Sequence, residues 1–255
     1  MTPASESFRF VTYNLRHNAD RWDERFPMLS EVLVQYAPDV LVMQEVWLPF
    51  YQAEMIADVL NTLPGTARYN VLTCPKWGDY DVEGISIVTR LPVMLYEHLN
   101  LPESGRMAQY ARLGFGDSFV DVVNTHLHHR PVEDESIRLP QMQRLLRWIN
   151  ERTAARGEHH WVLAGDLNTI PGRETIGLLS QQLQNAIPAG THTFPTAIAA
   201  ADFPPGFSVQ IDHVFYDDQY LTPLDWQVLG NDPHPDDAVL CASDHTGLGV
   251  TFRLK

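Results

Sequence analysis

The sequence predicts an α/β protein in which mixed β-sheets are covered by helices, and three observations lead to this class. Short runs rich in valine, isoleucine and aromatic residues recur along the whole chain. Amphipathic helical patterns separate only some of these runs, which is typical of mixed sheets and not of a regular parallel βαβ array. No Ser/Gly linker, low-complexity segment or internal repeat divides the chain. We therefore expect one domain over residues 1–255, with residues 1–7 as a flexible tail.

Eight segments show the composition of β-strands. The first alternates between apolar and polar residues, and the second is an almost continuous apolar run, as in a strand buried on both faces. The predicted strands cover residues 8–15, 40–46, 69–73, 85–89, 119–127, 161–164, 213–216 and 247–252. The pattern alone leaves open whether they form one sheet or two.

Two segments show helical spacing. Phe26, Leu29, Leu33 and Tyr36 fall on one face of a helix, in which Pro27 is tolerable only in the first turn. A second helical face consists of Met142, Leu145, Leu146 and Ile149, and Pro140 stands near its start.

Charge and composition limit the classes of function that are compatible with this sequence. The 255 residues include 32 acidic and 18 basic ones, for a net charge of −14. No basic stripe of the kind that binds long duplex DNA is visible. The two cysteines cannot form a disulfide framework, and we expect them to be buried. With neither a secretory signal nor an apolar run of membrane-spanning length in view, we expect a cytoplasmic protein without a transmembrane anchor.

Polar side chains stand at or next to the ends of the predicted strands, where a shared sheet edge would bring them into one cleft. Each has an ordinary structural alternative, such as a turn for Asn14 or a loop cap for Asp244. Their number and shared position favour a functional site. The set consists of Asn14, Glu45, His126, Asp166, Asn168, Asp212, His213, Asp244 and His245.

Oxygen ligands in this set suit Mg²⁺ or Mn²⁺. Glu45, Asp244 and Asn14 are the candidate ligands. Zinc is the weaker alternative, because strand alternation would place His126 and His128 on one face and His129 on the other. The sequence also has no His-Glu-x-x-His or Cys-x-x-Cys motif.

Seven ordered motifs resemble those of the endonuclease/exonuclease/phosphatase superfamily. They are Thr12-Tyr13-Asn14-Leu15, Gln44-Glu45-Val46, Gly84-Ile85-Ser86-Ile87-Val88-Thr89-Arg90, Asn124-Thr125-His126-Leu127, Gly165-Asp166-Leu167-Asn168, Ile211-Asp212-His213-Val214 and Ser243-Asp244-His245. The resemblance implies a four-layer α/β/β/α sandwich of two mixed sheets with helices outside. Asn14-Leu15-Arg16 with Trp22 and Arg25 further resembles a bacterial branch whose substrates are generally unassigned.

The resemblance also implies roles for the matching residues. Glu45 corresponds to the main metal-binding carboxylate, with Asn14 and Asp244 near the same ion. Asp166 corresponds to the residue that orients or deprotonates the attacking water, and Asn168 to one that holds a phosphoryl oxygen. His126 and His245 correspond to imidazoles that stabilise the pentacovalent phosphate, and Asp212 to the carboxylate that orients His245. Whether Asp166 or a histidine is the base stays open.

One position departs from the abasic-site endonucleases of that superfamily. They carry a tyrosine where this chain has Val82, which argues against a role in DNA repair. Asp81 or Glu83 is then a candidate partner for His126. Arg106, Arg130 and Arg138 are candidate substrate-binding cations, although arginines on an amphipathic helix are often only solvated.

Two loops are candidate substrate rims. One is Trp77-Gly78-Asp79-Tyr80, and the other is residues 191–209, which carry Phe194, Phe203 and Phe207. Ordinary loop packing explains both equally well.

The predicted activity is hydrolysis of a P–O bond by an activated water with Mg²⁺ or Mn²⁺ as cofactor. A phosphodiester is favoured as substrate, either a phosphorylated small molecule, a phospholipid head group or a short nucleic acid. A phosphomonoesterase acting on a sugar, inositol or nucleotide phosphate is the alternative, and a nuclease is another. A binding scaffold without activity ranks last, because Glu45, Asp166 and His245 are all present. No protein partner is evident from the sequence.

Overall fold

The computed structural model describes residues 7–65, 67–78, 82–129 and 131–255. Its strands form two mixed six-stranded sheets. Sheet A has the order β11 (Leu221–Leu229), β12 (Gly247–Leu254), β1 (Ser7–Asn14), β2 (Val40–Trp47), β4 (Glu83–Thr89) and β3 (Asn70–Pro75). Sheet B has the order β5 (Val93–Asn100), β6 (Met107–Phe115), β7 (Ser118–His126), β8 (Trp161–Asp166), β10 (Asp212–Tyr216) and β9 (Gln184–Asn185). In each sheet one central pair is parallel, β1 with β2 and β7 with β8, and the other pairs are antiparallel.

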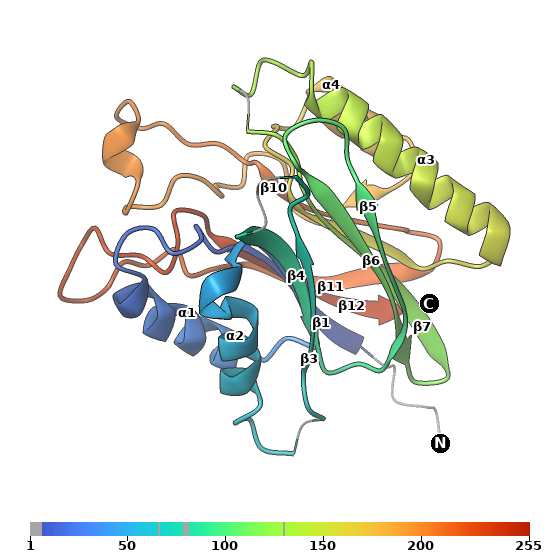
Figure 1. Ribbon diagram of the computed structural model, residues 1–255, viewed down its shortest axis with the longest axis horizontal. Coiled ribbons are helices and arrows are strands. Elements are labelled where there is room, and N and C mark those ends of the chain that lie inside the picture. Colours follow the sequence, from blue (N-terminus) through green and yellow to red (C-terminus); the bar gives the residue numbers. More distant parts are fainter. Residues whose placement is uncertain (1–6, 66, 79–81, 130) are drawn as a thin grey trace.

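Helices cover the outer faces of both sheets (Figure 1). α1 (Trp22–Tyr36) and α2 (Gln52–Leu60) pack on sheet A, and α3 (Arg138–Arg156) and α4 (Glu174–Leu179) pack on sheet B. Two short 3₁₀ turns are η1 (Leu48–Phe50) and η2 (Ala200–Asp202). The order helix, sheet, sheet, helix confirms the four-layer sandwich that the family resemblance implied.

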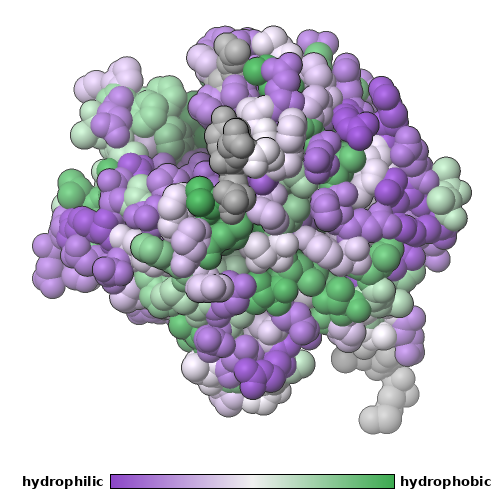
Figure 2. Space-filling view, viewed as in Figure 1, coloured by the Kyte–Doolittle hydropathy of each residue, from purple (hydrophilic) through white to green (hydrophobic). Residues whose placement is uncertain are grey.

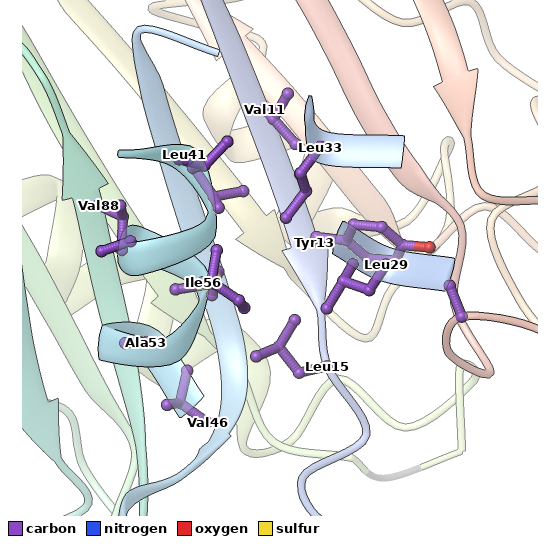
Figure 3. Close-up of a cluster of buried hydrophobic side chains, with 14 of the residues drawn as sticks. Val11, Tyr13, Leu15, Leu29, Leu33, Leu41, Val46, Ala53, Ile56 and Val88 are labelled. Atoms are coloured by element: carbon purple, nitrogen blue, oxygen red, sulfur yellow. The ribbon is translucent and has the colours of Figure 1, made fainter. Parts of the chain in front are cut away.

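Three apolar layers hold these elements together. Alternate residues of β1 show how, because Phe8 and Phe10 face sheet B while Val11 and Tyr13 face α1. Figure 3 shows the layer between sheet A and its helices, where Leu29 and Leu33 of α1 and Ile56 of α2 meet the strands. Each sheet is thus buried on both faces, which explains the nearly continuous apolar runs of its central strands.

A buried polar bridge joins the sheets near their functional edge. The Asn124 side chain on β7 donates to the carbonyls of Met43 and Ser86 on sheet A, at 3.1 Å each, and accepts from Gln44 Nε2 at 2.8 Å. Because both sheets contribute partners, the bridge fixes their relative position.

All eight predicted strands are confirmed. The structure adds β5, β6, β9 and β11 and the helices α2 and α4, which the sequence patterns did not indicate. β5 and β11 lie at sheet edges, where exposed residues interrupt the apolar pattern. Of the predicted tail, residues 1–6 lie outside the described residues, but Ser7 begins β1 and pairs with Arg253, so the prediction was wrong there.

The first-turn position predicted for Pro27 was also wrong. α1 begins at Trp22, so Pro27 lies in the second turn and removes the hydrogen bond to the Asp23 carbonyl. Asp23 and Pro27 are both exposed, which lets water replace that bond. The second helix begins where predicted, with Pro140 in the first turn of α3.

Both cysteines are buried free thiols, as expected. Within the described ranges, no helix has the length and apolar character needed to cross a membrane.

Candidate active site

The ends of neighbouring strands bring the predicted polar residues together. Asn14 ends β1, His126 ends β7 and Asp166 ends β8. Asn14 is paired with Gln44, while Asp166 is paired with both His126 and Asp212 in the strand register. Asp244 and His245 join them from the loop before β12. The predicted polar residues therefore do converge at strand ends, and strand ends of both sheets contribute to the group.

Asp166 is the centre of this group. Its Oδ2 accepts from Asn14 Nδ2 at 3.0 Å, and its Oδ1 accepts from the backbone N–H of Asn168 at 2.9 Å. The same Oδ2 lies 3.3 Å from His126 Nε2 and 3.8 Å from His245 Nε2. A buried carboxylate is thus held between two imidazoles, one at the end of β7 and one in the loop before β12.

The glycine before Asp166 is required by its surroundings. Gly165 has φ +143°, and a Cβ there would lie 1.9 Å from the Thr125 carbonyl oxygen of the neighbouring strand. Only glycine lets β7 and β8 approach closely enough to place His126 beside Asp166.

Asp212 and His245 form a buried dyad. His245 Nδ1 lies 2.8 Å from Asp212 Oδ2, which directs Nε2 of the ring toward Asp166. Burial alone would lower the pKa of His245, but the carboxylates of Asp212 and Asp166 outweigh it and raise that pKa well above its ordinary value. The dyad therefore presents a protonated imidazole to the cleft at neutral pH.

His126 has the opposite environment. Arg106 Nη1 donates to its Nδ1 at 2.6 Å, so the ring proton resides on Nε2, which faces Asp166. Burial and then the charge of Arg106 hold the pKa of His126 well below its ordinary value. His126 is thus a neutral N–H donor. Glu83, the candidate partner of His126, forms an ion pair with Lys76, and its charge opposes the lowering of the pKa of His126, so a direct contact between the two stays a prediction. Asp81 lies outside the described residues.

Glu45 projects into the cleft from a β-bulge. The register between β2 and β4 shifts between Met43 and Val46, and Glu45 takes φ +51°, a conformation that few residues other than glycine adopt. Its side chain is 26% exposed. Burial, followed by the charges of Asp244 and Glu83, raises the pKa of Glu45. A strained backbone that turns a carboxylate toward like charges indicates a functional position.

Asp244 lies on the same cleft and carries an ion pair that sequence reasoning missed. Arg16 Nη1 lies 2.7 Å from Asp244 Oδ2, and Arg16 also pairs with Asp20. In the sequence, only the place of Arg16 directly after Asn14-Leu15 suggested that it lies near the site. That place in the sequence does not show that Asp244 is its partner.

The donor set fits a divalent cation. Glu45 and Asp244 both line the cleft, and their mutual repulsion, seen in the raised pKa of Glu45, is what a bound Mg²⁺ or Mn²⁺ relieves. Asp166, Asp212 and His245 also offer ligand atoms within 4.8 Å of one another, but the Asp212–His245 hydrogen bond already occupies two of these groups. Asn14 uses its amide to hold Asp166 and its oxygen to accept from the Arg16 backbone, so its role as a ligand stays a prediction.

The cleft around these groups measures about 540 Å³, within the range of small-molecule sites. Both polar and apolar residues line it. The polar ones are Glu45, His126, His129, Glu133, Asp166, Asn168, Asp244 and His245, and the apolar ones are Pro131, Val132, Phe194, Phe203, Phe207, Val209 and Ile211.

The three predicted substrate-binding arginines have different positions. Arg106 is buried behind His126 and also reaches His129 Nδ1 at 3.3 Å, so it acts on the cleft through these imidazoles. Arg138 is fully buried and donates to Glu135 and to the carbonyls of His128 and Pro131, so both predictions for it, substrate contact and solvation, were wrong. Arg130 lies outside the described residues.

Asn168 lines the cleft, but its amide nitrogen donates to the Leu127 carbonyl at 3.1 Å. Its backbone is left-handed, with φ +51°, which turns the chain at the end of β8. Contact between this amide and a phosphoryl oxygen remains a prediction. His213, next to Asp212, is buried and its Nε2 pairs with the Thr169 carbonyl, so it serves the structure.

This fold and this cleft define a class of hydrolases in which two face-to-face sheets bring carboxylates and imidazoles to one edge. The chain belongs to the Endonuclease/Exonuclease/phosphatase family, a family of phosphoester hydrolases whose model matches residues 11–245. A comparison with curated protein sequences found no match.

Solved structures share the fold at low sequence identity. The catalytic domain of human Nocturnin with bound sulfate is 19% identical, with a TM-score of 0.77 over 98% of this chain and 94% of that one. D. rerio TDP2 complexed with a single-strand DNA product is 18% identical, with a TM-score of 0.76 over 97% and 99%. A mannosyl-6-phosphatase from Bacteroides thetaiotaomicron is 18% identical, with a TM-score of 0.75 over 96% and 99%. At such identities the likeness establishes the fold alone.

Proposed function

We propose that this protein is a divalent-metal-dependent phosphodiesterase that cleaves a P–O bond by in-line attack of water. The observation that carries the proposal is the Asp166 carboxylate between a protonated His245 and a neutral His126. This set provides an acceptor for the proton of water and two donors for the oxygens of a phosphoryl group.

In this mechanism Asp166 orients the attacking water and accepts its proton as the water oxygen bonds to phosphorus. The bond from phosphorus to the leaving oxygen breaks, and that oxygen departs as an alcohol after taking a proton from solvent. Asn14 and the backbone of Asn168 hold the carboxylate in place. A phosphoryl group bound beside Asp166 accepts hydrogen bonds from the Nε2–H groups of His245 and His126 as charge develops on its oxygens in the transition state. Asp212 keeps His245 protonated and oriented. Glu45 and Asp244 would hold a divalent ion, which would supply Lewis acidity for the phosphoryl transfer.

The shape of the cleft favours a diester over a monoester. A monoester has one organic substituent, whereas the cleft lining also includes a row of phenylalanine rings that begins beside His245 and offers apolar contacts to a second. The mannosyl-6-phosphatase shares only the fold, so its substrate does not argue for a monoester here.

Hydrolysis of bis(p-nitrophenyl) phosphate and p-nitrophenyl phosphate tests this proposal directly. We expect the diester to be preferred, with activity that requires Mg²⁺ or Mn²⁺ and is lost in EDTA. Asp166→Asn should lower kcat by about 10²- to 10⁴-fold, the usual contribution of a general base. Asp225→Asn makes the same chemical change at an exposed site on β11 and should behave as wild type.

Preference for the monoester would exclude a diesterase, and full activity in EDTA would exclude the metal. Asp166→Asn with wild-type turnover would refute the assigned site. Thermal unfolding of both variants distinguishes a catalytic loss from misfolding.

A further inference from the structure

The apolar residues that line the cleft include a row of aromatic rings that starts beside His245. The ring of Phe194 lies 4.8 Å from that of His245, and Phe203 lies 5.1 Å from Phe194 in an edge-to-face contact. Phe207 follows at 4.9 Å from Phe203, with the two rings nearly parallel at 12°. We call Phe194, Phe203 and Phe207 the phenylalanine wall.

The outer end of the wall is open to solvent. Phe207 is 38% exposed although it lines the cleft. The segment that carries it, drawn in orange near residue 200 in Figure 1, projects away from the sheets, and Figure 2 shows hydrophobic side chains gathered on this projection. Stacked phenylalanines left uncovered beside a polar catalytic centre indicate a surface that binds an apolar group.

The base of the wall is anchored to the catalytic residues. Thr196 donates its backbone N–H to the Asp244 carbonyl at 2.8 Å and its hydroxyl to the Ser243 carbonyl. Phe194 pairs with Val209 in an isolated bridge that closes the segment on itself. These contacts fix the position of Phe194 beside His245. A ligand on the wall therefore has a defined position relative to a phosphate bound at His245.

We propose that the phenylalanine wall binds a planar aromatic ring carried by one ester substituent of the phosphodiester, either a nucleobase or an aryl group. This inference rests on the proposed function and specifies its substrate class. With the phosphate beside His245, the substituent extends along the wall, and its ring stacks on the exposed face of Phe207.

Ring geometry and charge favour this substituent over the other apolar choices. The parallel Phe203–Phe207 pair offers flat faces, onto which a further ring continues the stack, whereas an acyl chain gains only from apolar area. The net charge of −14 opposes both a long polyanionic nucleic acid and an anionic membrane surface. A small diester with one planar group can stack on these rings and carries less negative charge than a long nucleic acid or an anionic membrane.

Two diesters with the same leaving group test the wall. Thymidine 5′-(p-nitrophenyl phosphate) and methyl p-nitrophenyl phosphate differ only in the second substituent. We expect Phe207→Ala to lower kcat/KM for the thymidine diester by on the order of tenfold, as for a lost base–aromatic stack. Phe207→Leu keeps apolar area without a ring face and should lose nearly as much. Phe50→Ala removes a phenylalanine that is 48% exposed but does not line the cleft, and should match wild type.

The pattern of losses identifies the source of the ring. A loss confined to the thymidine diester assigns the wall to a nucleobase, and an equal loss on both substrates assigns it to the aryl leaving group. Unchanged kcat/KM in Phe207→Ala on both substrates would overturn the proposal. So would Phe207→Leu with wild-type values together with turnover of a short-chain phosphatidylcholine, because that result indicates an acyl chain.

A binding measurement separates this inference from the proposed function. If wild-type protein cleaves no diester, calorimetric titration with thymidine 5′-monophosphate and ribose 5-phosphate still examines the wall. Preferential binding of the thymidine compound that Phe207→Ala abolishes supports the ring site without the activity. Equal binding of both compounds by wild type and variant contradicts it.

Discussion

Two histidines at the centre of this cleft differ in protonation although they face the same carboxylate. His245 is paired with Asp212 and is held protonated, whereas His126 accepts a hydrogen bond from Arg106 and is held neutral. The difference comes from the residue behind each ring, a carboxylate in one case and a guanidinium in the other. Both arrangements aim an Nε2–H toward Asp166, so the site has two donors but adds only one positive charge.

Replacement of Arg106 should affect turnover more than substrate binding. Arg106→Met removes the donor that fixes the tautomer of His126, and we expect kcat to fall by about 10- to 100-fold with KM changed much less. Arg106→Gln retains an N–H donor without the charge and should recover part of the loss. Steady-state kinetics with a diester substrate provides both constants. A rise in KM at constant kcat would instead indicate direct substrate binding, the role predicted from the sequence.

The protonation of His245 should depend on Asp212. Asp212→Asn removes the anion that outweighs burial, so the pKa of His245 should fall from well above its ordinary value toward or below it. In wild type the imidazolium then persists as pH rises past neutrality, and in the variant it deprotonates at lower pH. NMR titration of the ring nitrogens in metal-free protein measures this change. Identical titration curves for wild type and variant would refute the dyad.

At the scale of elements, strand ends and their irregularities form the site. Asn14, His126 and Asp166 occupy strand ends, as the apolar runs predicted. Glu45 depends on a bulge in β2 and Asp244 on the loop before β12. Loop elements also support the cleft, because Glu135 accepts from Arg138 on α3, from the Thr169 hydroxyl and from the backbone of Thr175 at the start of α4.

Arg138→Ala should therefore destabilise the protein. The substitution leaves the partly buried Glu135 carboxylate and the carbonyls of His128 and Pro131 without this donor, which costs roughly 3 kcal/mol of unfolding free energy. Arg147→Ala on the exposed face of the same helix should change stability by less than about 0.5 kcal/mol. Urea unfolding measures both values. Equal stability of the two variants would contradict the structural role of Arg138.

At the scale of the whole molecule, the layered fold and the net charge act on different properties. Two sheets buried on both faces provide a rigid support for the cleft, and the buried Asn124 bridge holds the sheets together. The charge of −14 instead governs the approach of anionic ligands.

Salt should distinguish this protein from a nuclease that binds through a basic surface. Added monovalent salt screens the repulsion between the acidic protein and an anionic diester, so kcat/KM should stay constant or rise from low salt to about 0.2 M. A basic nucleic-acid-binding protein loses affinity steeply over the same range. Initial rates at constant Mg²⁺ concentration measure the effect. A steep fall with salt would point to a cationic binding surface that attracts the substrate.

Sequence patterns predicted eight strands and the helices α1 and α3. These elements were predictable because side chains alternate with period two in strands and recur at helical spacing in helices. The internal strand β6 was missed although it is largely buried, because Gln109 and Arg112 interrupt its apolar pattern. Edge strands β5 and β11 were missed because exposure to solvent removes that periodicity. Seven ordered motifs also resemble those of the family to which the chain belongs.

The sequence alone thus determined the family, the class of fold and the residues that meet at one edge, because these depend on local periodicity and on residue identity. Only the tertiary structure decided which residues are partners. Arg106 behind His126, Arg16 on Asp244 and the phenylalanine wall beside His245 are contacts between segments far apart in the chain. Such contacts depend on how two sheets and their loops pack in three dimensions, and no spacing along the chain encodes that packing.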